Sequence, residues 1–407
     1  MNPPRKKSRP SELHRVALLA GALALLFPGI APAEAKESLT PPKTRRIVAI
    51  SDIHGAYENL CTILQTTNLI DSKNRWIGGD SVFVQTGDFL DRGPNTRKVA
   101  RLLMDLQEQA PTQGGEVVVL LGNHEVLNII SDMRYVSDLA TFAARDSEAQ
   151  RQSHCETRVQ QIQDDIQNAG GDRPEAEKVL AQCLAQTPPG LLEYQEEMSP
   201  RGEIGAWLRS LPAAAKIGDT LFLHGGISPK KRKLSIQEIN ERVRWEIETF
   251  DRIRAEGLAR GYIFPGANLQ AVVAGARTMK AKERRLPKEL KRDLDEFTKF
   301  KEWFLVAPEG PLWFRGYAKW SEEEGSKEIA RILAAQKARH VVVGHTPQKQ
   351  FSILGRFDNR VFLIDTGMLS SYYKGRASAL EIRNGEFQAV YVDGVDLLLG
   401  SEAGHHH

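Results

Sequence analysis

The strongest constraint on the fold is the alternation of two kinds of sequence between residues 45 and 125. Three short apolar runs, rich in β-branched residues, read "RIVAIS", "SVFVQTGD" and "EVVVLLGN". Before the last run, the stretch "RKVARLLMDLQ" has apolar residues at helical spacing, namely Val99, Leu102, Leu103 and Leu106. Strands that alternate with amphipathic helices predict an α/β fold with a parallel sheet and right-handed crossovers.

Each of these apolar runs ends in polar residues. The endings read "SDIHG", "TGDFLDRG" and "GNHE". In an open α/β sheet the ligand crevice lies at the carboxyl ends of the strands. We therefore expect the three polar clusters to converge at one edge of the sheet.

The rest of the chain contains two long helical segments and several further strands. Residues 131–200 are polar and helix-permissive, and residues 230–310 form a second helical segment. Between them, "AAKIGDTLFLHGG" predicts a strand hairpin that turns at Gly218–Asp219. Strands return in "HVVVGHT", "RVFLIDTG" and "ASALEIRNGEFQAVYV", the last with a hairpin turn at Asn384–Gly385.

The first 35 residues differ from the rest. A basic stretch precedes the apolar run "VALLAGALALLFPGI" and small residues at A-x-A spacing in "APAEA". This order is typical of a secretory signal peptide, and the apolar run of about 15 residues is shorter than the roughly 20 that span a bilayer. We expect cleavage after Ala33 or Ala35, export to the periplasm or out of the cell, and no membrane anchor in the mature protein.

Charge argues against a nucleic-acid partner. The whole chain has 55 Lys and Arg against 52 Asp and Glu, and residues 1–35 hold five of the basic and two of the acidic residues. The mature protein is therefore neutral overall, whereas nucleic-acid binders carry basic surfaces.

We expect one domain over residues 36–400, with 131–200 as a helical insertion, and a tail at 401–407.

The three cysteines are too few for a disulfide scaffold and have no zinc-binding spacing. Cys155 and Cys183 flank a polar stretch that Gly170–Gly171 and Pro174 divide into two predicted helices. An antiparallel helical hairpin would bring its two ends together. We therefore predict a Cys155–Cys183 disulfide, with Cys61 unpaired, and the alternative is two free thiols packed as small hydrophobic groups.

The polar residues at the ends of apolar runs form a candidate metal site. They are Asp52, His54, Asp88, Asn123, His124, His224 and His345. A single residue of this kind is more often a turn former, but here five separate glycine-flanked segments each supply one or two. A mixed set of nitrogen and oxygen donors suits manganese, iron or zinc rather than calcium.

Four of these segments carry a family resemblance. "SDIHG", "GDFLDRG", "GNHE" and "HGG" resemble, in order and spacing, the signatures of the phosphoprotein phosphatase family within the calcineurin-like metallophosphoesterases, over roughly residues 45–370. "LLGNHEVLNIISDMRYV", "PLWFRGY" and "GHTPQ" further resemble the bacterial and plant branch called Shewanella-like phosphatases. Ser51 departs from the usual glycine of the first signature, a change between small residues that we expect to be tolerated.

The resemblance implies a fold with two mixed β-sheets packed as a sandwich and flanked by helices. We expect the parallel strands of the first third in one sheet and the later hairpins in the second. It also implies two divalent ions, with Mn²⁺ expected and Fe or Zn²⁺ as alternatives. The implied ligands are Asp52, His54 and Asp88 for the first ion, and Asp88, Asn123, His224 and His345 for the second.

The same resemblance implies roles in hydrolysing phosphate monoesters by a water that two metal ions activate. His124 would donate a proton to the leaving group, and Asp91 would orient His124. The residues that would bind the phosphate are Arg92, Arg315 and Asn123.

The resulting hypothesis is a metal-dependent protein phosphatase, with a phosphoprotein or phosphopeptide as its substrate. Preference for phosphoserine and phosphothreonine or for phosphotyrosine stays open at this point. A symmetrical dinucleoside-polyphosphate hydrolase is the alternative enzyme, and a non-catalytic phosphopeptide-binding module is the alternative outside enzymes. Asp91 before Arg92, Glu125 after His124, and the "MRYV" and "LWFRGY" stretches favour the phosphatase.

Overall fold

The computed structural model describes residues 45–144, 147–168 and 170–400. The predicted signal peptide and the tail lie outside these residues, so cleavage and export stay predictions. Within the described ranges, no helix combines the length and apolar character needed to cross a membrane.

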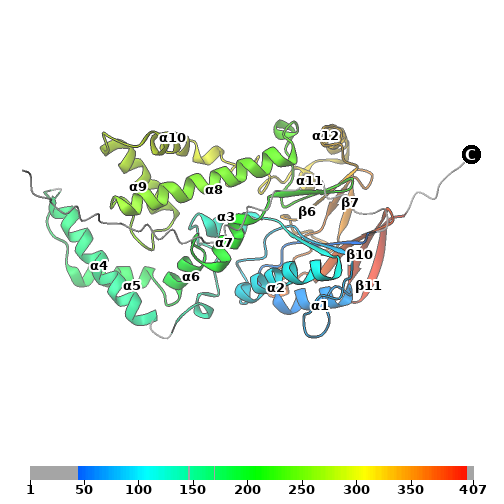
Figure 1. The fold of residues 1–407 in the computed structure, drawn as a ribbon, viewed down its shortest axis with the longest axis horizontal. Helices are drawn as coiled ribbons and strands as arrows, with labels where there is room; N and C mark the ends of the chain where they lie inside the picture. Colours follow the sequence, from blue (N-terminus) through cyan, green and yellow to red (C-terminus); the bar gives the residue numbers. More distant parts are fainter. Residues whose placement is uncertain (1–44, 145–146, 169, 401–407) are drawn as a thin grey trace, which may run out of the picture. The chain divides into compact units, whose positions relative to one another are not determined.

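The first sheet has six strands in the order β11-β10-β9-β1-β2-β3 (Figure 1). Its parallel strands are β1 (Ile47–Ile50), β2 (Val82–Gln85) and β3 (Glu116–Val119). The crossover helices are α1 (Tyr57–Thr66) and α2 (Thr96–Gln109). The predicted apolar stripe of α2 is buried in the core. The β-α-β opening is therefore confirmed.

The last three strands extend this sheet beyond β1. They are β9 (Ser378–Arg383), β10 (Glu386–Tyr391) and β11 (Gly394–Leu399), and β9 pairs antiparallel with β1. The hairpin turn at Asn384–Gly385 is confirmed, but its expected place in the second sheet was wrong. The local sequence pattern predicts the two strands and their turn. The sheet that these strands join depends instead on which sheet has an edge strand that can pair with them.

The second sheet has five strands in the order β4-β5-β6-β8-β7. They are β4 (Ala214–Ile217), β5 (Thr220–Leu223), β6 (His340–Val343), β7 (Leu354–Arg356) and β8 (Val361–Leu363). β5, β6 and β8 are parallel, and β4 and β5 form the hairpin predicted around Gly218–Asp219. β7 was not predicted, because its sequence, Leu-Gly-Arg, lacks the apolar run that marks the equally short β8.

The two sheets pack against each other as a sandwich, as expected. Alternate residues of β1 face opposite sides: Ile47 and Ala49 belong to the core between the sheets, whereas Val48 and Ile50 face the helices. Phe362 of the second sheet stacks on Phe387 of the first, with ring centroids 4.4 Å apart. This packing holds the carboxyl ends of β1, β2, β5 and β6 in fixed relation.

The segment predicted as an insertion consists mainly of helices. Its helices are α4 (Ser147–Asn168), α5 (Ala176–Gln186) and α6 (Leu191–Glu197), followed by α7 (Glu203–Ser210). α4 and α5 lie side by side (Figure 1). Cys155 and Cys183 form the predicted disulfide between them, with their Cα atoms 5.6 Å apart, and Cys61 is free.

The disulfide gives a direct solution test. We expect thiol titration of the unfolded, non-reduced protein to find one reactive thiol, that of Cys61. In the chain-entropy model a crosslink closing a loop of this size stabilises the fold by on the order of 3 kcal/mol. Three reactive thiols would contradict the bridge.

The second helical segment is also confirmed. Its main helices are α8 (Ile236–Ala259), α9 (Leu269–Lys282) and α10 (Lys288–Phe297). The remaining α-helices of the described residues are α3 (Asn123–Ile129), α11 (Gly316–Lys319), α12 (Glu322–Gln336) and α13 (Ser370–Tyr373). Ser235 begins α8 with a capping box, because its hydroxyl accepts from the Glu238 N–H and the Glu238 carboxylate accepts from the Ser235 N–H.

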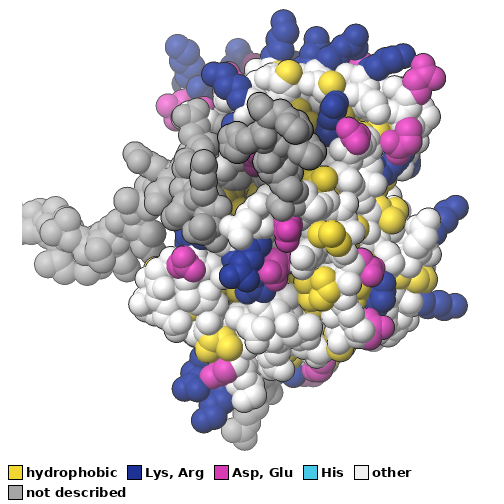
Figure 2. Space-filling model, turned by 90° about the vertical axis from the view of Figure 1, so that its right-hand side faces the viewer, with side chains coloured by type: hydrophobic (Ala, Val, Ile, Leu, Met, Phe, Trp, Pro, Cys, Tyr) yellow, Lys and Arg dark blue, Asp and Glu magenta, His cyan; other side chains and the backbone are white. Residues whose placement is uncertain are grey.

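Figure 2 shows one face of the molecule, on which hydrophobic side chains are interspersed with charged ones.

Candidate active site

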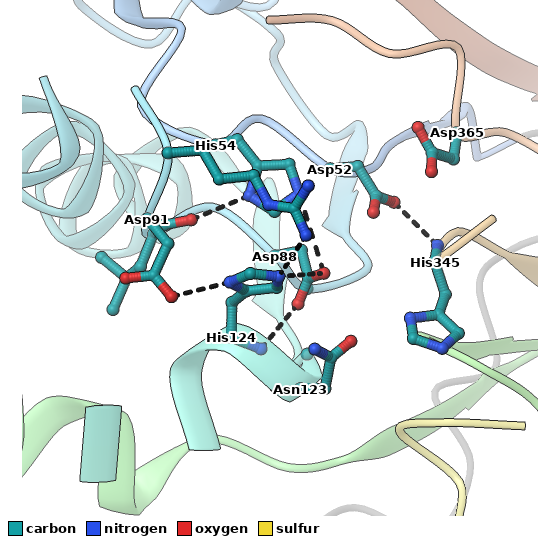
Figure 3. A network of polar contacts seen from close by, with 12 residues as sticks. Asp52, His54, Asp88, Asp91, Asn123, His124, His345 and Asp365 are labelled. Atoms are coloured by element: carbon teal, nitrogen blue, oxygen red, sulfur yellow. Dashed lines mark hydrogen bonds and ion pairs between the residues drawn. The ribbon is translucent and has the colours of Figure 1, made fainter. Parts of the chain in front are cut away.

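Five strand ends meet at one place, as the sequence predicts. Asp52 follows β1, Asp88 follows β2, Asn123 begins α3 after β3, and His224 and His345 follow β5 and β6. Most of the labelled side chains in Figure 3 point toward a common centre. A pocket of about 190 Å³ opens onto them, and its lining includes every predicted site residue except Asp91 and His224.

The backbone reaches this arrangement through left-handed conformations. Residues with positive φ are Asp52 (47°), His54 (47°), Asp88 (57°), Asp91 (66°), Arg92 (68°) and His345 (69°). The spacing of Asp52 and His54 predicts that both point to the same side of an extended strand end, but the two residues lie in a turn that follows β1. Such conformations cost on the order of 1–3 kcal/mol each and cluster at functional sites.

Glycines allow the close approach of these turns. A Cβ atom on Gly122 would lie 2.2 Å from Asp88 Oδ1, and one on Gly344 would lie 2.2 Å from Asp52 Oδ2. Ser51, the departure from the usual signature, is buried, and its hydroxyl donates to Asp52 Oδ2. The substitution thus adds a hydrogen bond to a candidate ligand.

Asp88 lies at the centre of the site. Its Oδ2 atom is 3.1 Å from His224 Nε2, 3.8 Å from His54 Nε2 and 3.9 Å from His124 Nε2. Burial opposes ionisation of this carboxyl, yet the surrounding imidazoles hold its pKa well below the usual value. The carboxylate is therefore ionised and able to bind cations.

The geometry gives two groups of donor atoms that share Asp88. One comprises His54, Asp88 and His124, and the other Asp88, His224 and His345; within each group the donor atoms lie within 4.8 Å of one another. Asn123 Oδ1 lies 3.1 Å from His224 Nε2. Asp52 is adjacent, and its Oδ2 accepts from the His345 N–H at 2.9 Å.

The chemistry of these donors fits divalent metal ions. Imidazole binds a metal in its neutral form. Burial and the neighbouring His124 lower the pKa of His54 to about 3, and burial also lowers the pKa of His345 well below its usual value. Both rings are therefore neutral, whereas at His224 the Asp88 carboxylate outweighs burial and raises the pKa to about 9, so a metal ion would have to displace a proton there. The imidazole nitrogens together with carboxylate and amide oxygens make a mixed donor set that suits manganese, iron or zinc.

His124 and Asp91 form a buried pair. His124 Nδ1 donates to Asp91 Oδ2 at 2.6 Å. Burial opposes a charge on the ring, but the Asp88 and Asp91 carboxylates outweigh it and raise the pKa of His124. An imidazole with a raised pKa and a fixed orientation is suited to donate a proton.

Two residues that were not predicted from the sequence extend the hydrogen bonding of this pair. Asn128 Nδ2 donates to Asp91 Oδ1 at 2.9 Å, and the Tyr194 hydroxyl of α6 donates to Asn128 Oδ1 at 2.7 Å. Asn128 lies four residues after His124, so helical spacing could have indicated it. Tyr194 lies in the helical insertion, 66 positions away from Asn128, and no local signal connects it to the site.

We expect Tyr194→Phe to lower kcat about two- to fivefold while the metal content is unchanged. The change leaves Asn128 without its donor, and one hydrogen bond contributes about 1 kcal/mol. Steady-state kinetics with an aryl phosphate gives the measurement. Phe142→Leu is the matched control, because Phe142 packs against the Tyr194 ring without a hydrogen bond to it, and an equal loss of kcat in both variants would contradict the prediction.

Two arginines are placed to bind an oxyanion. Arg92 Nε is buried and has no hydrogen-bond partner among the described residues, and Arg92 Nη2 lies 3.1 Å from His124 Nε2. Arg315 Nη1 donates to the His345 carbonyl at 2.7 Å and to Thr346 Oγ1 at 3.0 Å, and the Arg315 side chain lines the pocket. A guanidinium group can donate several hydrogen bonds at once to a phosphate.

Comparison with known families decides the classification. The model of the calcineurin-like phosphoesterase family matches residues 45–349. This chain belongs to the calcineurin-like phosphoesterase family. It is accordingly a metal-dependent phosphoesterase, and its four signature segments lie at the strand ends described above.

Several members of the family are similar over most of this chain. Shewanella-like protein phosphatase 1 of Plasmodium berghei is 26% identical over 85% of this chain and 74% of its own length. Shewanella-like protein phosphatase 2 of Arabidopsis thaliana is 31% identical over 51% of this chain and 53% of its own length. The solved structure of a cold-active protein-tyrosine phosphatase from a psychrophilic Shewanella species is 26% identical, with a TM-score of 0.58 over 89% of this chain and 82% of that one.

Proposed function

We propose that this phosphoesterase is a protein phosphatase that prefers phosphotyrosine. The observation that carries the preference is the set of aromatic rings around Arg92. Its guanidinium carbon lies 5.0 Å from the ring centroids of Tyr135 and Tyr372 and 5.3 Å from that of Tyr373. Tyr135 and Tyr372 are partly exposed, with 36% and 58% of their surface accessible.

This arrangement favours an aryl ester over an alkyl ester. A phosphate bound by Arg92 would place its leaving group among these rings, where a phenyl ring can stack or make edge contacts worth about 0.5–1.5 kcal/mol each. A serine or threonine side chain offers no such ring. The names of the relatives, which include a protein-tyrosine phosphatase, agree with this proposal.

In the proposed reaction the residues of this chain bind the phosphate, orient the proton donor and protonate the leaving group. Divalent ions, when bound by the donors around Asp88, polarise the phosphate and lower the pKa of water in the site. Arg92 and Arg315 hold the phosphate oxygens, and Asn123 lies beside them. His124, oriented by Asp91, donates a proton to the leaving phenolate.

We expect matched peptides that differ only in the phosphorylated residue to separate the alternatives. The phosphotyrosine peptide should have a kcat/KM at least about tenfold above those of the phosphoserine and phosphothreonine peptides, which corresponds to about 1.4 kcal/mol of aromatic contact. Faster hydrolysis of phosphoserine would contradict the tyrosine preference. Faster turnover of diadenosine tetraphosphate than of any peptide would favour the dinucleoside-polyphosphate hydrolase instead.

We also propose that Mn²⁺ is the resident metal and that the protein is exported. The mixed nitrogen and oxygen donors support manganese, with iron and zinc as the alternatives. The disulfide supports export, because disulfides persist in oxidising compartments. Metal analysis of the protein from its native compartment, together with the N-terminal sequence of that material, tests both proposals.

A further inference from the structure

A second, larger cavity lies beside the catalytic pocket. Its volume is about 880 Å³, against about 190 Å³ for the catalytic pocket. α4, α5 and α6, the segment 131–139 after α3 and the start of α9 contribute its lining. Cavities of 300–1,000 Å³ are typical of ligand sites, and none of the roles assigned above uses this one.

The cavity contains an unpartnered buried acceptor. Only 7% of the Gln195 surface is exposed, and its Oε1 atom has no hydrogen-bond partner in the part of the chain that the structure describes. The Nε2 atom of the same side chain is engaged, since it donates to the Gly266 carbonyl at 3.2 Å. A buried polar atom without a partner costs free energy, so this carbonyl is suited to accept a hydrogen bond from a ligand N–H.

Other amides share this lining. Gln182, Gln186 and Gln270 line the cavity together with Gln195. A side-chain amide both donates and accepts. An extended peptide presents alternating N–H and C=O groups that need partners when they leave water, so this lining complements a peptide backbone.

One segment of the chain borders both the cavity and the catalytic pocket. Tyr135 lines the catalytic pocket, whereas its neighbours Met133, Arg134 and Val136 line the cavity. The Arg134 guanidinium carbon lies 5.8 Å from the centroid of the Tyr135 ring, and that of Arg92 lies 5.0 Å from the same ring. The segment around Tyr135 therefore separates the catalytic pocket from the cavity by about one residue.

The charge of the lining favours acidic ligands. The lining includes two guanidinium groups, those of Arg134 and Arg158, and one carboxylate, that of Asp132. Asp132 pairs with Arg134. Arg158 also lies over the Phe264 ring, 3.8 Å from its centroid. Guanidinium groups thus outnumber carboxylates among the lining residues.

We propose that this cavity binds the extended, acidic stretch of the substrate protein that flanks the phosphorylated residue. The proposal rests on the protein phosphatase function above and adds a determinant of substrate choice to it. The helical insertion then acts in recognition, because α4, α5 and α6 together with the segment 131–139 supply most of the cavity lining.

The test compares a phosphotyrosine peptide carrying acidic residues on both flanks with an aryl phosphate that lacks flanks. Gln182→Trp, from an exposed position on α5, fills the cavity, and Gln195→Met removes the buried acceptor. Ala181→Trp is the matched control, since Ala181 is its exposed neighbour on α5 and does not line the cavity. Binding of a non-hydrolysable phosphonate form of the peptide gives a readout that does not depend on turnover.

We expect Gln182→Trp and Gln195→Met each to lower the ratio of peptide to aryl phosphate kcat/KM about fivefold, the loss typical of one or two hydrogen bonds. Phosphonate affinity should fall in parallel, and Ala181→Trp should change neither. Shortening one flank of the peptide should reduce wild-type turnover in the same way. An unchanged ratio in both variants would overturn the inference, whereas a wild-type protein that hydrolyses no phosphomonoester would instead refute the proposed function.

Discussion

Replacing His124 with asparagine is expected to lower kcat by about 10²- to 10⁴-fold, the range typical of a general acid. The imidazole is the group best placed to protonate the leaving phenolate, because Asp91 fixes its Nδ1 and Arg92 lies against its Nε2. Asparagine keeps a polar side chain on α3 but cannot transfer a proton. Steady-state kinetics on an aryl phosphate measures the loss.

The same variant separates proton donation from metal binding. We expect His124→Asn to retain its metal, measured by elemental analysis on the kinetic sample. His124 Nε2 lies 3.9 Å from Asp88 Oδ2 and belongs to one of the two donor groups, so the geometry alone does not divide these roles. A folded His124→Asn protein without metal would contradict its assignment as proton donor. An aryl phosphate with a better leaving group should restore part of the lost rate, since it needs less protonation.

The second large effect is expected from Asp88→Asn, which should lose metal and activity together. Asp88 is shared by both donor groups and is the ionised carboxylate at their centre. An amide of the same size removes the negative charge that two cations would share. We expect activity to fall by about 10³-fold or more, because metal ions contribute several kcal/mol to stabilising the transition state.

A buried carboxylate elsewhere provides the control for that variant. Asp293 of α10 is 1% exposed and pairs with Arg252 at 2.8 Å. Asp293→Asn should reduce stability without loss of metal. If Asp88→Asn kept its metal and its activity, Asp88 would not be the bridging ligand.

The candidate site could be predicted because each of its motifs is short and contiguous. An apolar run, a glycine and an adjacent Asp or His are visible in the sequence, and parallel topology places such endings at one edge. Asp88, His224 and His345 were recognised as candidates in this way. The turns that aim them were not, because left-handed φ values at Asp52 and His54 depend on contacts between separate strands.

Residues contributed by distant segments escaped prediction for a physical reason. Tyr194 of α6 donates to Asn128 of α3, and the ring of Tyr373 in α13 lies 5.3 Å from the Arg92 guanidinium carbon. Neither tyrosine follows an apolar run that would mark it in the sequence. The β9–β10 hairpin was recognised, yet its pairing with β1 was not. The local sequence pattern determines whether a segment forms a strand, whereas contacts across the whole fold determine which strand it pairs with.

The most direct test of the dinuclear metal centre is a metal titration of protein first stripped of its ions. Bound Mn²⁺ and hydrolysis of an aryl phosphate are followed on the same samples as metal is added. We predict no activity without metal and full activity as occupancy approaches two ions per chain. Full activity in the metal-free protein would contradict the account.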